Sequence, residues 1–379
     1  MKHSKHTKLV KPITGAYGFN EIAILGTTCE KINEIAHAII SQLGKNLNIA
    51  YIDADHSQEN AEISHTKLQD KINQLQINTR NRSSVLQKTT LNSENLVLLN
   101  GNHFQSRKQI ICIDSKKESS LQKRKEQITD VLAIIIFEPE AEPYPWLKNH
   151  LDEISVDKIP VFGFSENEAL GVNIKNSLQK PPLKALILKG GKSQRMGEDK
   201  SRLAYHGVPQ EEYLKNIFLE MGIEAFVSES QSTNTENTII DTFTGLGPYG
   251  GILSAFREDP NSAWLVIACD LPLIGLKEIQ HLVNHRNIYK SATACYNPET
   301  DFPDPLFTIW EPRAYSILLH YLSQGYSCPR KVLINEDIEL VQLENPGILR
   351  NCNTPEERAE VMKLITNTSK QRLFRDFFR

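Results

Sequence analysis

The sequence predicts an α/β protein with two domains, each built on a mostly parallel sheet. Apolar segments of strand length alternate with segments of helical periodicity along the chain, which is the pattern of parallel sheets covered by helices. The 379 residues also exceed the length at which a single hydrophobic core usually stops growing, about 250–300 residues. We therefore expect one sheet in each half of the chain.

Composition and charge exclude several classes of protein. The chain has 43 basic and 46 acidic residues, a balance that gives no electrostatic case for nucleic acid as a partner. Its six cysteines are scattered, without a C-x-x-C pair or a histidine at metal spacing, which argues against a zinc site and a disulfide framework. The basic N-terminus lacks the apolar region of a signal peptide, and no apolar run approaches the roughly 18–20 residues of a membrane span. We expect a cytoplasmic protein with reduced thiols and no membrane partner.

The first half opens with a strand, a loop, a helix and a second strand. Residues 21–29 predict a short strand that runs into a loop, apolar residues at helical spacing follow over 32–40, and residues 47–52 predict the next strand. Residues 57–95 are polar and poorly periodic, so we expect loops or weak helix there. The remaining expected elements are a charged helix over 115–129 and buried strands over 96–99, 109–113, 131–137 and 160–164.

The domain limits follow from composition. The first domain is expected over 1–171, and residues 172–182, which are polar and end in a proline pair that disfavours helix, are interpreted as the linker. An apolar strand over 183–188 opens the second domain, expected over 183–365. The tail, 366–379, carries Phe374, Phe377 and Phe378 among basic residues, and both a docking or dimer-contact helix and a frayed end stay open.

The loop after the strand 183–188 has the composition of a phosphate-binding loop. Gly190 and Gly191 allow close approach of the backbone to a ligand, and a run of free N–H groups there would form a nest for anions. Lys192, Arg195 and Lys200 add three cations within nine residues. Such a loop suits a polyphosphate whose leaving charge must be stabilised.

The whole string from Leu186 to Lys200 resembles the signature loop of the nucleotidyltransferases similar to molybdenum cofactor guanylyltransferase (MobA-type). Further matching segments follow in the family's order, and the resemblance covers about residues 183–362. These segments are Asp241 with Gly247–Ile252, Trp264–Pro272 with Cys269-Asp270, Asp304–Phe307, and Asn351–Glu357.

The resemblance implies a Rossmann-like (GT-A-like) nucleotidyltransferase fold with a mostly parallel mixed sheet. It implies a Mg²⁺-dependent enzyme that transfers GMP from GTP to molybdopterin or molybdenum cofactor and releases pyrophosphate. The implied catalytic residues are Lys200, Arg195 and Asp270. The implied nucleotide-binding residues are Leu188, Gly190, Gly191, Lys192, Ser193, Lys200, Ser230, Asp241 and Gly247. Asp270 and Asn353 would bind the metal ion, and Asn351 would close the site with Asn353. Further implied partners are molybdenum cofactor biosynthesis proteins, recipient apoenzymes, or a second copy in a homo-oligomer.

Elementary chemistry agrees with the implied role of Asp270. This residue follows a buried strand, where open α/β sheets bind ligands, and its carboxylate suits Mg²⁺, which uses one or two carboxylates plus substrate phosphates. No general base is required when the nucleophile is already an anionic phosphate. Structural interpretations stay open beside these roles: Asp270 as a helix N-cap, Asp241 as a turn residue, and Thr354-Pro355 as a helix start.

Two residues depart from the family pattern. Lys189 stands where the family usually has a small residue, and Ser230 stands where it usually has an asparagine that contacts the base. Because base contacts set nucleotide choice, CTP in place of GTP stays open, as does a sugar phosphate acceptor. A non-catalytic scaffold for cofactor delivery is the alternative from another class.

The first domain carries a loop at the position of a P-loop without the P-loop residues. Residues 26–33 follow a strand and open a helix, but the second glycine, the lysine and the Ser/Thr of G-x-x-x-x-G-K-[ST] are not in place. Residues 96–102 and 109–113 resemble a region of the MobB-type accessory GTPase, with Asn100 in place of its glutamate, and Asp53–His56 match its short histidine segment. We expect a degenerate P-loop domain that has lost hydrolysis. Whether it binds, dimerises or positions a partner, or is retained for stability, stays open.

Overall fold

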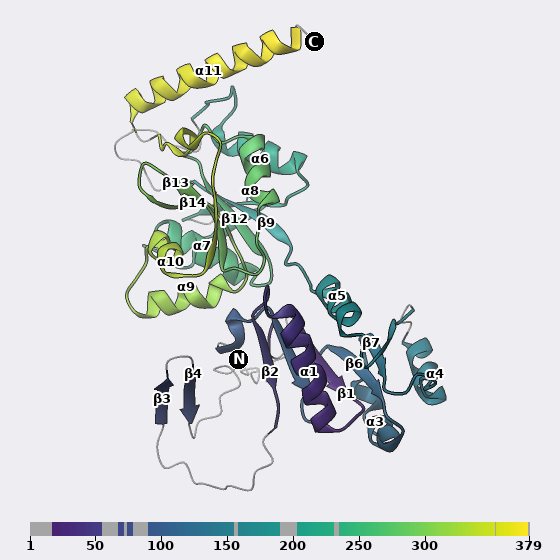
Figure 1. The fold of residues 1–379 in the computed structure, drawn as a ribbon. Helices are drawn as coiled ribbons and strands as arrows, with labels where there is room; N and C mark the ends of the chain where they lie inside the picture. Colours follow the sequence, from purple (N-terminus) through teal and green to yellow (C-terminus); the bar gives the residue numbers. More distant parts are fainter. Residues whose placement is uncertain are drawn as a thin grey trace, which may run out of the picture. The chain divides into compact units, whose positions relative to one another are not determined.

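The chain folds into two compact units, Met1–Gln179 and Lys180–Arg379 (Figure 1). The structure is a computed structural model. It describes residues 17–54, 67–71, 74–78, 90–154, 158–189, 203–230, 235–352 and 354–377, and the side chains of these residues except 67–71, 74–78 and 367–377.

The first unit is built on a parallel sheet, as predicted. Within its described residues the sheet has six strands in the order β2-β5-β1-β6-β7-β8. All adjacent pairs run parallel, so every strand ends at the same edge. The strands are β1 (Glu21–Leu25), β2 (Ile49–Ile52), β5 (Leu96–Asn100), β6 (Lys108–Ile113), β7 (Val131–Ile136) and β8 (Val161–Gly163).

Short helices cover this sheet. The predicted periodicity over 32–40 is confirmed, because Ile32, Ile35, Ala36 and Ile39 of the first helix are buried. The α-helices are α1 (Cys29–Leu43), α3 (Glu118–Gln122), α4 (Pro145–Glu153) and α5 (Asn167–Ser177), and the 3₁₀ turns are η1 (Leu91–Ser93), η2 (Ser115–Lys117) and η3 (Lys125–Gln127).

Three local predictions in this unit are wrong. The expected helix over 115–129 is broken into η2, α3 and η3, because α3 buries only Leu121 and has no apolar stripe to hold a longer helix. Residues 67–71 and 74–78, expected as loop or weak helix, form the antiparallel strands β3 and β4, with Leu68 opposite Ile77. Helix α5 extends into the expected linker because its buried Leu170 and Ile174 lie one turn apart.

The second unit contains the mixed sheet expected for it. Its described strands follow the order β11-β10-β9-β12-β14-β13-β15, and β14 runs antiparallel to both of its neighbours. The strands are β9 (Leu183–Leu188), β10 (Ala225–Glu229), β11 (Thr238–Ile240), β12 (Ala263–Ala268), β13 (Ala292–Asn297), β14 (Phe302–Trp310) and β15 (Ile338–Val341).

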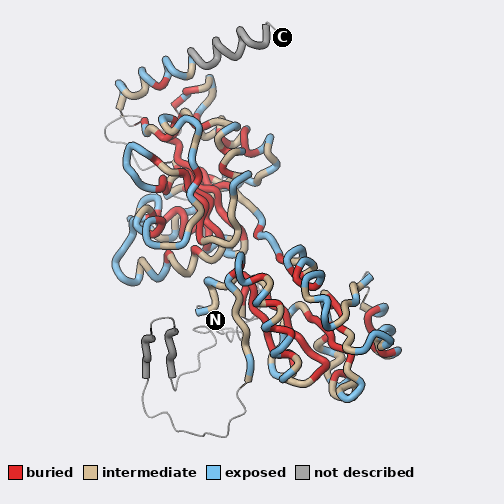
Figure 2. The backbone as a smooth tube through the Cα atoms, in the orientation of Figure 1, coloured by how far each residue is buried: buried red, intermediate tan, exposed pale blue. Residues whose placement is uncertain are grey.

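Helices cover both faces of this sheet, and β12 at its centre is buried along its whole length (Figure 2). Helices α6 (Gln210–Glu220) and α8 (Leu276–Asn284) pack on one face with Ile187, Leu265 and Ile267. Helices α7 (Pro248–Glu258), α9 (Ala314–Ser323) and α10 (Pro329–Asn335) pack on the other face with Leu186, Leu188 and Val266. A 3₁₀ turn, η5 (Pro346–Leu349), precedes the last helix, α11 (Pro355–Phe377).

The predicted helix start at Thr354-Pro355 is confirmed. The Thr354 hydroxyl accepts a hydrogen bond from the Glu357 N–H at 3.2 Å, and the Glu357 carboxylate accepts one from the Thr354 N–H at 3.1 Å. This reciprocal pair is a capping box. Helix α11 then continues into the predicted tail, whose docking role stays a prediction.

Two compositional expectations can be compared with the described residues. All six cysteines are free, as predicted. Among the described residues, no group of three or more His, Cys, Asp or Glu side chains could hold a metal ion, and no helix is long and apolar enough to cross a membrane.

The start of α7 packs so tightly that a methyl group would not fit. A Cβ atom at Gly250 would lie 2.2 Å from the Phe243 carbonyl oxygen, whereas one at Gly171 in α5 would meet only the flexible end of the Gln42 side chain. We expect Gly250→Ala to lower the free energy of unfolding by about 1–3 kcal/mol, despite the usual helix preference for alanine. Chemical denaturation of Gly250→Ala and of the control Gly171→Ala measures this difference, and equal stability of the two variants would contradict it.

Candidate functional site

Polar side chains follow several neighbouring strands of the second sheet at one edge. Because β9, β10, β11 and β12 run parallel, their carboxyl ends meet there, and β14 begins at the same edge because it runs antiparallel. In the spatial order of the strands, the residues at this edge are Asp241, Ser230, Lys189, Asp270 and Asp304. Ligands bind open α/β sheets at this position, so this edge is the candidate site.

The pairing of β9 with β12 fixes the centre of the edge. Leu188 lies opposite Ala268 in the parallel register, and the Cys269 N–H donates to the Leu188 carbonyl at 3.0 Å. The chain therefore leaves both strands at the same level, through Lys189 and through Cys269-Asp270. Asp270 is not a helix N-cap, since α8 begins at Leu276 with Gly275 as its cap.

Part of the predicted site lies outside the described residues. Leu188, Ser230, Asp241, Gly247, Asp270 and Asn351 are described and belong to segments that end at or lead to this edge. The predicted roles of Gly190, Gly191, Lys192, Ser193, Arg195, Lys200 and Asn353 stay predictions, because these residues are outside the described part of the chain.

Asp241 lies between the end of β11 and the start of α7. Its carboxylate accepts a hydrogen bond from the Ser228 hydroxyl at 2.6 Å, and burial raises the pKa of Asp241 even though this hydrogen bond opposes the rise. Gly247 caps α7 with φ 56° and ψ −136°, a conformation open to glycine alone, and Pro248 takes the first helical position. Pro248 has no N–H, and the Gly250 and Gly251 N–H groups donate to the Gly247 carbonyl, so the positive end of the α7 dipole, and not a set of unpaired N–H groups, lies at this side of the edge.

Gly251 allows α7 to approach the strand ends. A Cβ atom there would lie 2.8 Å from both a Leu188 methyl group and the Ser228 hydroxyl oxygen. The Gly250-Gly251 pair thus brings the helix N-terminus within reach of Asp241. This explains, in packing terms, why the segment from Gly247 to Ile252 carries glycines inside a helix.

Lys189, one of the two departures from the family pattern, is held in an ion-pair network. Its ammonium group contacts the Glu229 carboxylate and lies 3.0 Å from the Glu211 carboxylate of α6. Partial burial lowers the pKa of Lys189, but the hydrogen bonds that its ammonium group donates to both carboxylates more than offset this and hold the pKa above its usual value. Lys189 therefore links β9, β10 and α6. Ser230, the second departure, is exposed just beyond β10.

Asp304 and Arg330 form a second polar group at the edge. Asp304 belongs to one of the matched sequence segments, and Arg330 belongs to none of them. Asp304 is buried, which raises its pKa; hydrogen bonds from the Leu306 N–H and the Asn297 amide oppose this rise. The charge of Arg330 also lowers the pKa of Asp304, whereas the charge of Asp270 raises it, so both charges lie close to this carboxyl. Arg330 Nε is buried and makes no hydrogen bond within the described chain. No local pattern around Arg330 marks it.

The closing segment of the motif meets Asp270 directly. The Cys352 N–H donates to the Asp270 carbonyl at 2.8 Å, and Asn351 next to it is exposed. This contact brings the last predicted segment to the turn that carries Asp270, 82 residues earlier in the sequence.

The donor set at this edge suits Mg²⁺. The carboxylates of Asp270 and Asp304 are hard oxygen donors, although the described residues contain no group of three or more His, Cys, Asp or Glu side chains that could hold a metal ion without further ligands. Mg²⁺ typically takes one or two carboxylates and completes its shell with water and substrate phosphates. The residues present therefore fit the ion that the sequence predicted.

In the first unit, the P-loop position is closed by the chain itself. Only residues 26–28 connect β1 with α1, and Gly26 adopts φ 100° with its Cα packed on the Cys112 carbonyl. The Thr27 hydroxyl donates to Asp114 at 2.7 Å, and the Lys31 ammonium lies 3.4 Å from the same carboxylate. Thr27 and Lys31 at this position therefore both contact the Asp114 carboxylate, and not a phosphate.

The neighbouring strand ends are occupied in the same way. Asn100, which replaces the family's glutamate, is fully buried and donates to the Asp53 carboxylate at 2.8 Å. The loss of nucleotide hydrolysis in this unit stays a prediction.

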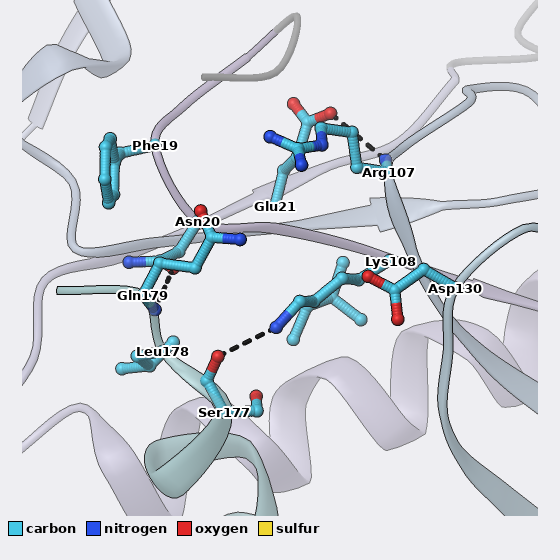
Figure 3. A pocket seen from close by; sticks show the side chains of 10 residues that line it. Phe19, Asn20, Glu21, Arg107, Lys108, Asp130, Ser177, Leu178 and Gln179 are labelled. Carbon is cyan, nitrogen blue, oxygen red and sulfur yellow. Dashed lines mark hydrogen bonds between the residues drawn. The ribbon is translucent and has the colours of Figure 1, made fainter. Parts of the chain in front are cut away.

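A surface depression in the first unit lies at the opposite end of its sheet (Figure 3). Its polar groups are already used to fasten the end of α5 to the strands. The Lys108 ammonium donates to the Ser177 carbonyl at 2.8 Å, and the Gln179 N–H donates to the Asn20 side chain at 2.8 Å. We therefore interpret this depression as a structural junction.

Comparison with known proteins identifies the class of the second unit. Residues 185–339 match the family model of the MobA-like NTP transferase domain. The second unit therefore contains a nucleotidyltransferase domain of this family, which confirms the predicted resemblance.

Individual relatives are similar to larger or smaller parts of the chain. A molybdenum cofactor biosynthesis bifunctional protein from a Synechocystis species is 29% identical over 225 residues, which span 55% of this chain and 65% of that protein. A molybdenum cofactor guanylyltransferase from Xanthomonas euvesicatoria is 28% identical over 184 residues, 46% of this chain and 92% of that protein. A crystal structure of molybdopterin-guanine biosynthesis protein B is 16% identical, covers 42% of this chain and 99% of that chain, and has a TM-score of 0.30.

The raised pKa of Asp241 leads to a prediction about stability. A carboxyl group whose pKa is raised by folding stabilises the fold below its usual pKa of about 3.9, and this contribution is lost as the pH rises through the raised value. We expect Asp241→Asn to be more stable than the wild type at pH 7, with an advantage that shrinks as the pH falls toward 4. Thermal unfolding midpoints across this pH range test it, with the exposed Asp130→Asn as control. A wild type that is more stable at pH 7 would refute the assignment.

Proposed function

We propose that the second unit is a molybdenum cofactor guanylyltransferase. It transfers GMP from GTP to molybdopterin or molybdenum cofactor and releases pyrophosphate. The observation that carries the proposal is the sheet edge that holds Asp241 after β11, Asp270 after β12 and Asp304 near the start of β14, inside a domain that matches the MobA-like family. The relative from Xanthomonas, whose length is almost fully covered, carries this activity in its name.

The order of strands divides the edge into two sides. Asp241 and the N-terminus of α7 lie on one side of Asp270, and Asp304 with Arg330 lies on the other. We assign the first side to the nucleotide, because the positive end of the α7 dipole favours its phosphates. We assign the second side to the acceptor, because the guanidinium of Arg330 suits a phosphate monoester.

The reaction is an in-line displacement at the α-phosphorus. A phosphate oxygen of the acceptor forms the new P–O bond, and the bond to the pyrophosphate oxygen breaks. The acceptor phosphate is already anionic, so the protein needs to orient it and no side chain has to remove a proton. Asp270 and Asn353 would hold Mg²⁺, which, when bound, neutralises charge on the triphosphate. The cations of the loop, Lys192, Arg195 and Lys200, would stabilise the charge on the leaving pyrophosphate.

Pyrophosphate release tests the proposed function. Purified full-length protein is incubated with Mg²⁺, molybdopterin and each of GTP, CTP, ATP and UTP in turn. We expect release with GTP alone, which would also show that serine is tolerated at position 230. Release with CTP would keep the enzyme class and change the reaction, and absence of release with every nucleotide would favour a different acceptor or the scaffold.

Asp270→Ala tests the assignment at the centre of the edge. Because the carboxylate is expected to hold the metal ion, its loss should lower turnover by at least roughly 100-fold with little change in thermal stability. Asp337→Asn is the matched control, since Asp337 is an exposed carboxylate that precedes β15 at the opposite edge of the same sheet. Turnover retained by Asp270→Ala would remove Asp270 from the mechanism.

The same variant also tests the first unit. If the closed P-loop position has lost hydrolysis, full-length Asp270→Ala should release neither pyrophosphate nor inorganic phosphate from GTP. Persistent release of inorganic phosphate from this variant would assign a GTPase activity to the first unit and contradict the interpretation of Asp114 and Thr27 as its blocking groups.

A further inference from the structure

One turn of the second unit contacts two segments of the proposed site. Residues 203–209 form a narrow turn in which Ala204 pairs with Pro209 and the Gln210 N–H donates to the Leu203 carbonyl at 3.0 Å. Its consecutive residues Tyr205 and His206 reach different segments. Neither residue belongs to the family motifs that the sequence displays.

Tyr205 binds the closing segment. Its hydroxyl donates to the Cys352 Sγ atom at 3.0 Å, and Tyr205 and Cys352 are 3% and 0% exposed. Together with Leu203 and Val361 they form a buried cluster against which Leu273 packs. Cys352 in turn donates its N–H to the Asp270 carbonyl at 2.8 Å. The Tyr205 hydroxyl, the Cys352 thiol and a backbone hydrogen bond thus connect the turn to the closing segment and to Asp270.

His206 contacts the turn that carries Asp270, through Pro272. Its Nε2 atom lies 2.8 Å from the Pro272 carbonyl, which can only accept, so this nitrogen carries the hydrogen. The ring is stacked on Tyr213 of α6, with centroids 3.7 Å apart and planes inclined by 13°. Burial lowers the pKa of His206, which keeps the ring neutral and its single N–H fixed on Pro272.

We propose that Tyr205, His206 and Cys352 form a clamp that sets the position of Asn351 relative to Asp270, and so keeps the closing segment in the geometry that the transfer needs. This inference rests on the proposed function and adds positioning residues to it. The clamp residues touch no substrate in this assignment; they act through Asp270 on one side and through Asn351 on the other.

The reason for a clamp lies in the reaction. Transfer requires the acceptor oxygen and the α-phosphorus to be held in line at near contact, and a displacement of about 1 Å can cost 10²-fold in rate. Asp270 and Asn351 belong to segments far apart in the sequence, so their separation depends on contacts between those segments. Loosening the clamp should therefore slow the chemical step and leave binding of the nucleotide almost unchanged.

Tyr205→Phe removes the hydrogen bond and keeps the buried ring. We expect kcat to fall by roughly tenfold while KM for GTP changes less than about twofold. Cys352→Ala should lower kcat to a similar extent. The double variant Tyr205→Phe/Cys352→Ala should have a kcat no lower than that of either single variant, because both changes remove the same hydrogen bond. Cys352→Ser keeps a hydrogen-bond acceptor and should recover part of kcat. The matched control is Tyr321→Phe in α9. This variant removes a hydrogen bond of 2.9 Å from the tyrosine hydroxyl to the Glu336 carboxylate and should leave kcat unchanged.

Amide hydrogen exchange gives a readout that does not need turnover. The Cys352 N–H should exchange faster in Tyr205→Phe than in the wild type and in Tyr321→Phe. Three results would each overturn the clamp. The Cys352 N–H could exchange faster while kcat stays unchanged, its exchange rate could stay unchanged, or the losses of kcat could add in the double variant. If the wild-type chain releases no pyrophosphate, the proposed function fails. The contacts of the clamp are then still tested by amide exchange: faster exchange of the Cys352 N–H in Tyr205→Phe supports them, and an unchanged rate overturns them.

Discussion

The site in the second unit depends on the parallel register of β9 and β12. Six residue pairs, from Leu183–Ala263 to Leu188–Ala268, hold the two strands so that both end at the same level. The chain then turns in two directions, into the glycine-rich loop after Lys189 and into the turn that carries Asp270. A shift of one residue would exchange the two faces of β12 and place Trp264 and Val266 in the core that Leu265 and Ile267 now fill. The fully buried apolar residues of both strands prevent such a shift.

The edge collects charge at some cost in stability, and the surrounding structure offsets part of it. Asp241 and Asp304 are partly desolvated, which raises their pKa values, and each is kept by specific hydrogen bonds from Ser228, or from Asn297 and the Leu306 N–H. Lys189 serves the opposite purpose, since its charge is satisfied by two glutamates on the α6 side of the sheet. Partly desolvated carboxylates with raised pKa values, beside a lysine that two glutamates neutralise, are features of functional sites.

Sequence reasoning worked where the signal is local. The strand Ala263–Ala268 followed by Asp270, the helix start at Thr354-Pro355 and the parallel sheets were all predictable from short patterns of polarity and capping. It failed where the outcome depends on distant partners. Lys189 gave no sign of its contact with Glu229, 40 residues away, and Arg330 none of its closeness to Asp304. Helix α5 was missed because its anchors, Leu170 and Ile174, are sparse in a polar segment and stabilise it only through packing.

The placement of β14 has a consequence for synthesis of the chain. This strand inserts between β12 and β13, although β13 precedes it in the sequence. A nascent chain that has emerged only as far as β13 therefore exposes the bare edge of β12, an apolar strand with unpaired N–H and C=O groups that invites pairing with other chains. The sheet closes, and the carboxylates at its edge come together, only after Trp310 has left the ribosome. Association of this unit with folding factors would therefore be strongest late in translation, when β12 has been synthesised but β14 has not yet paired with it.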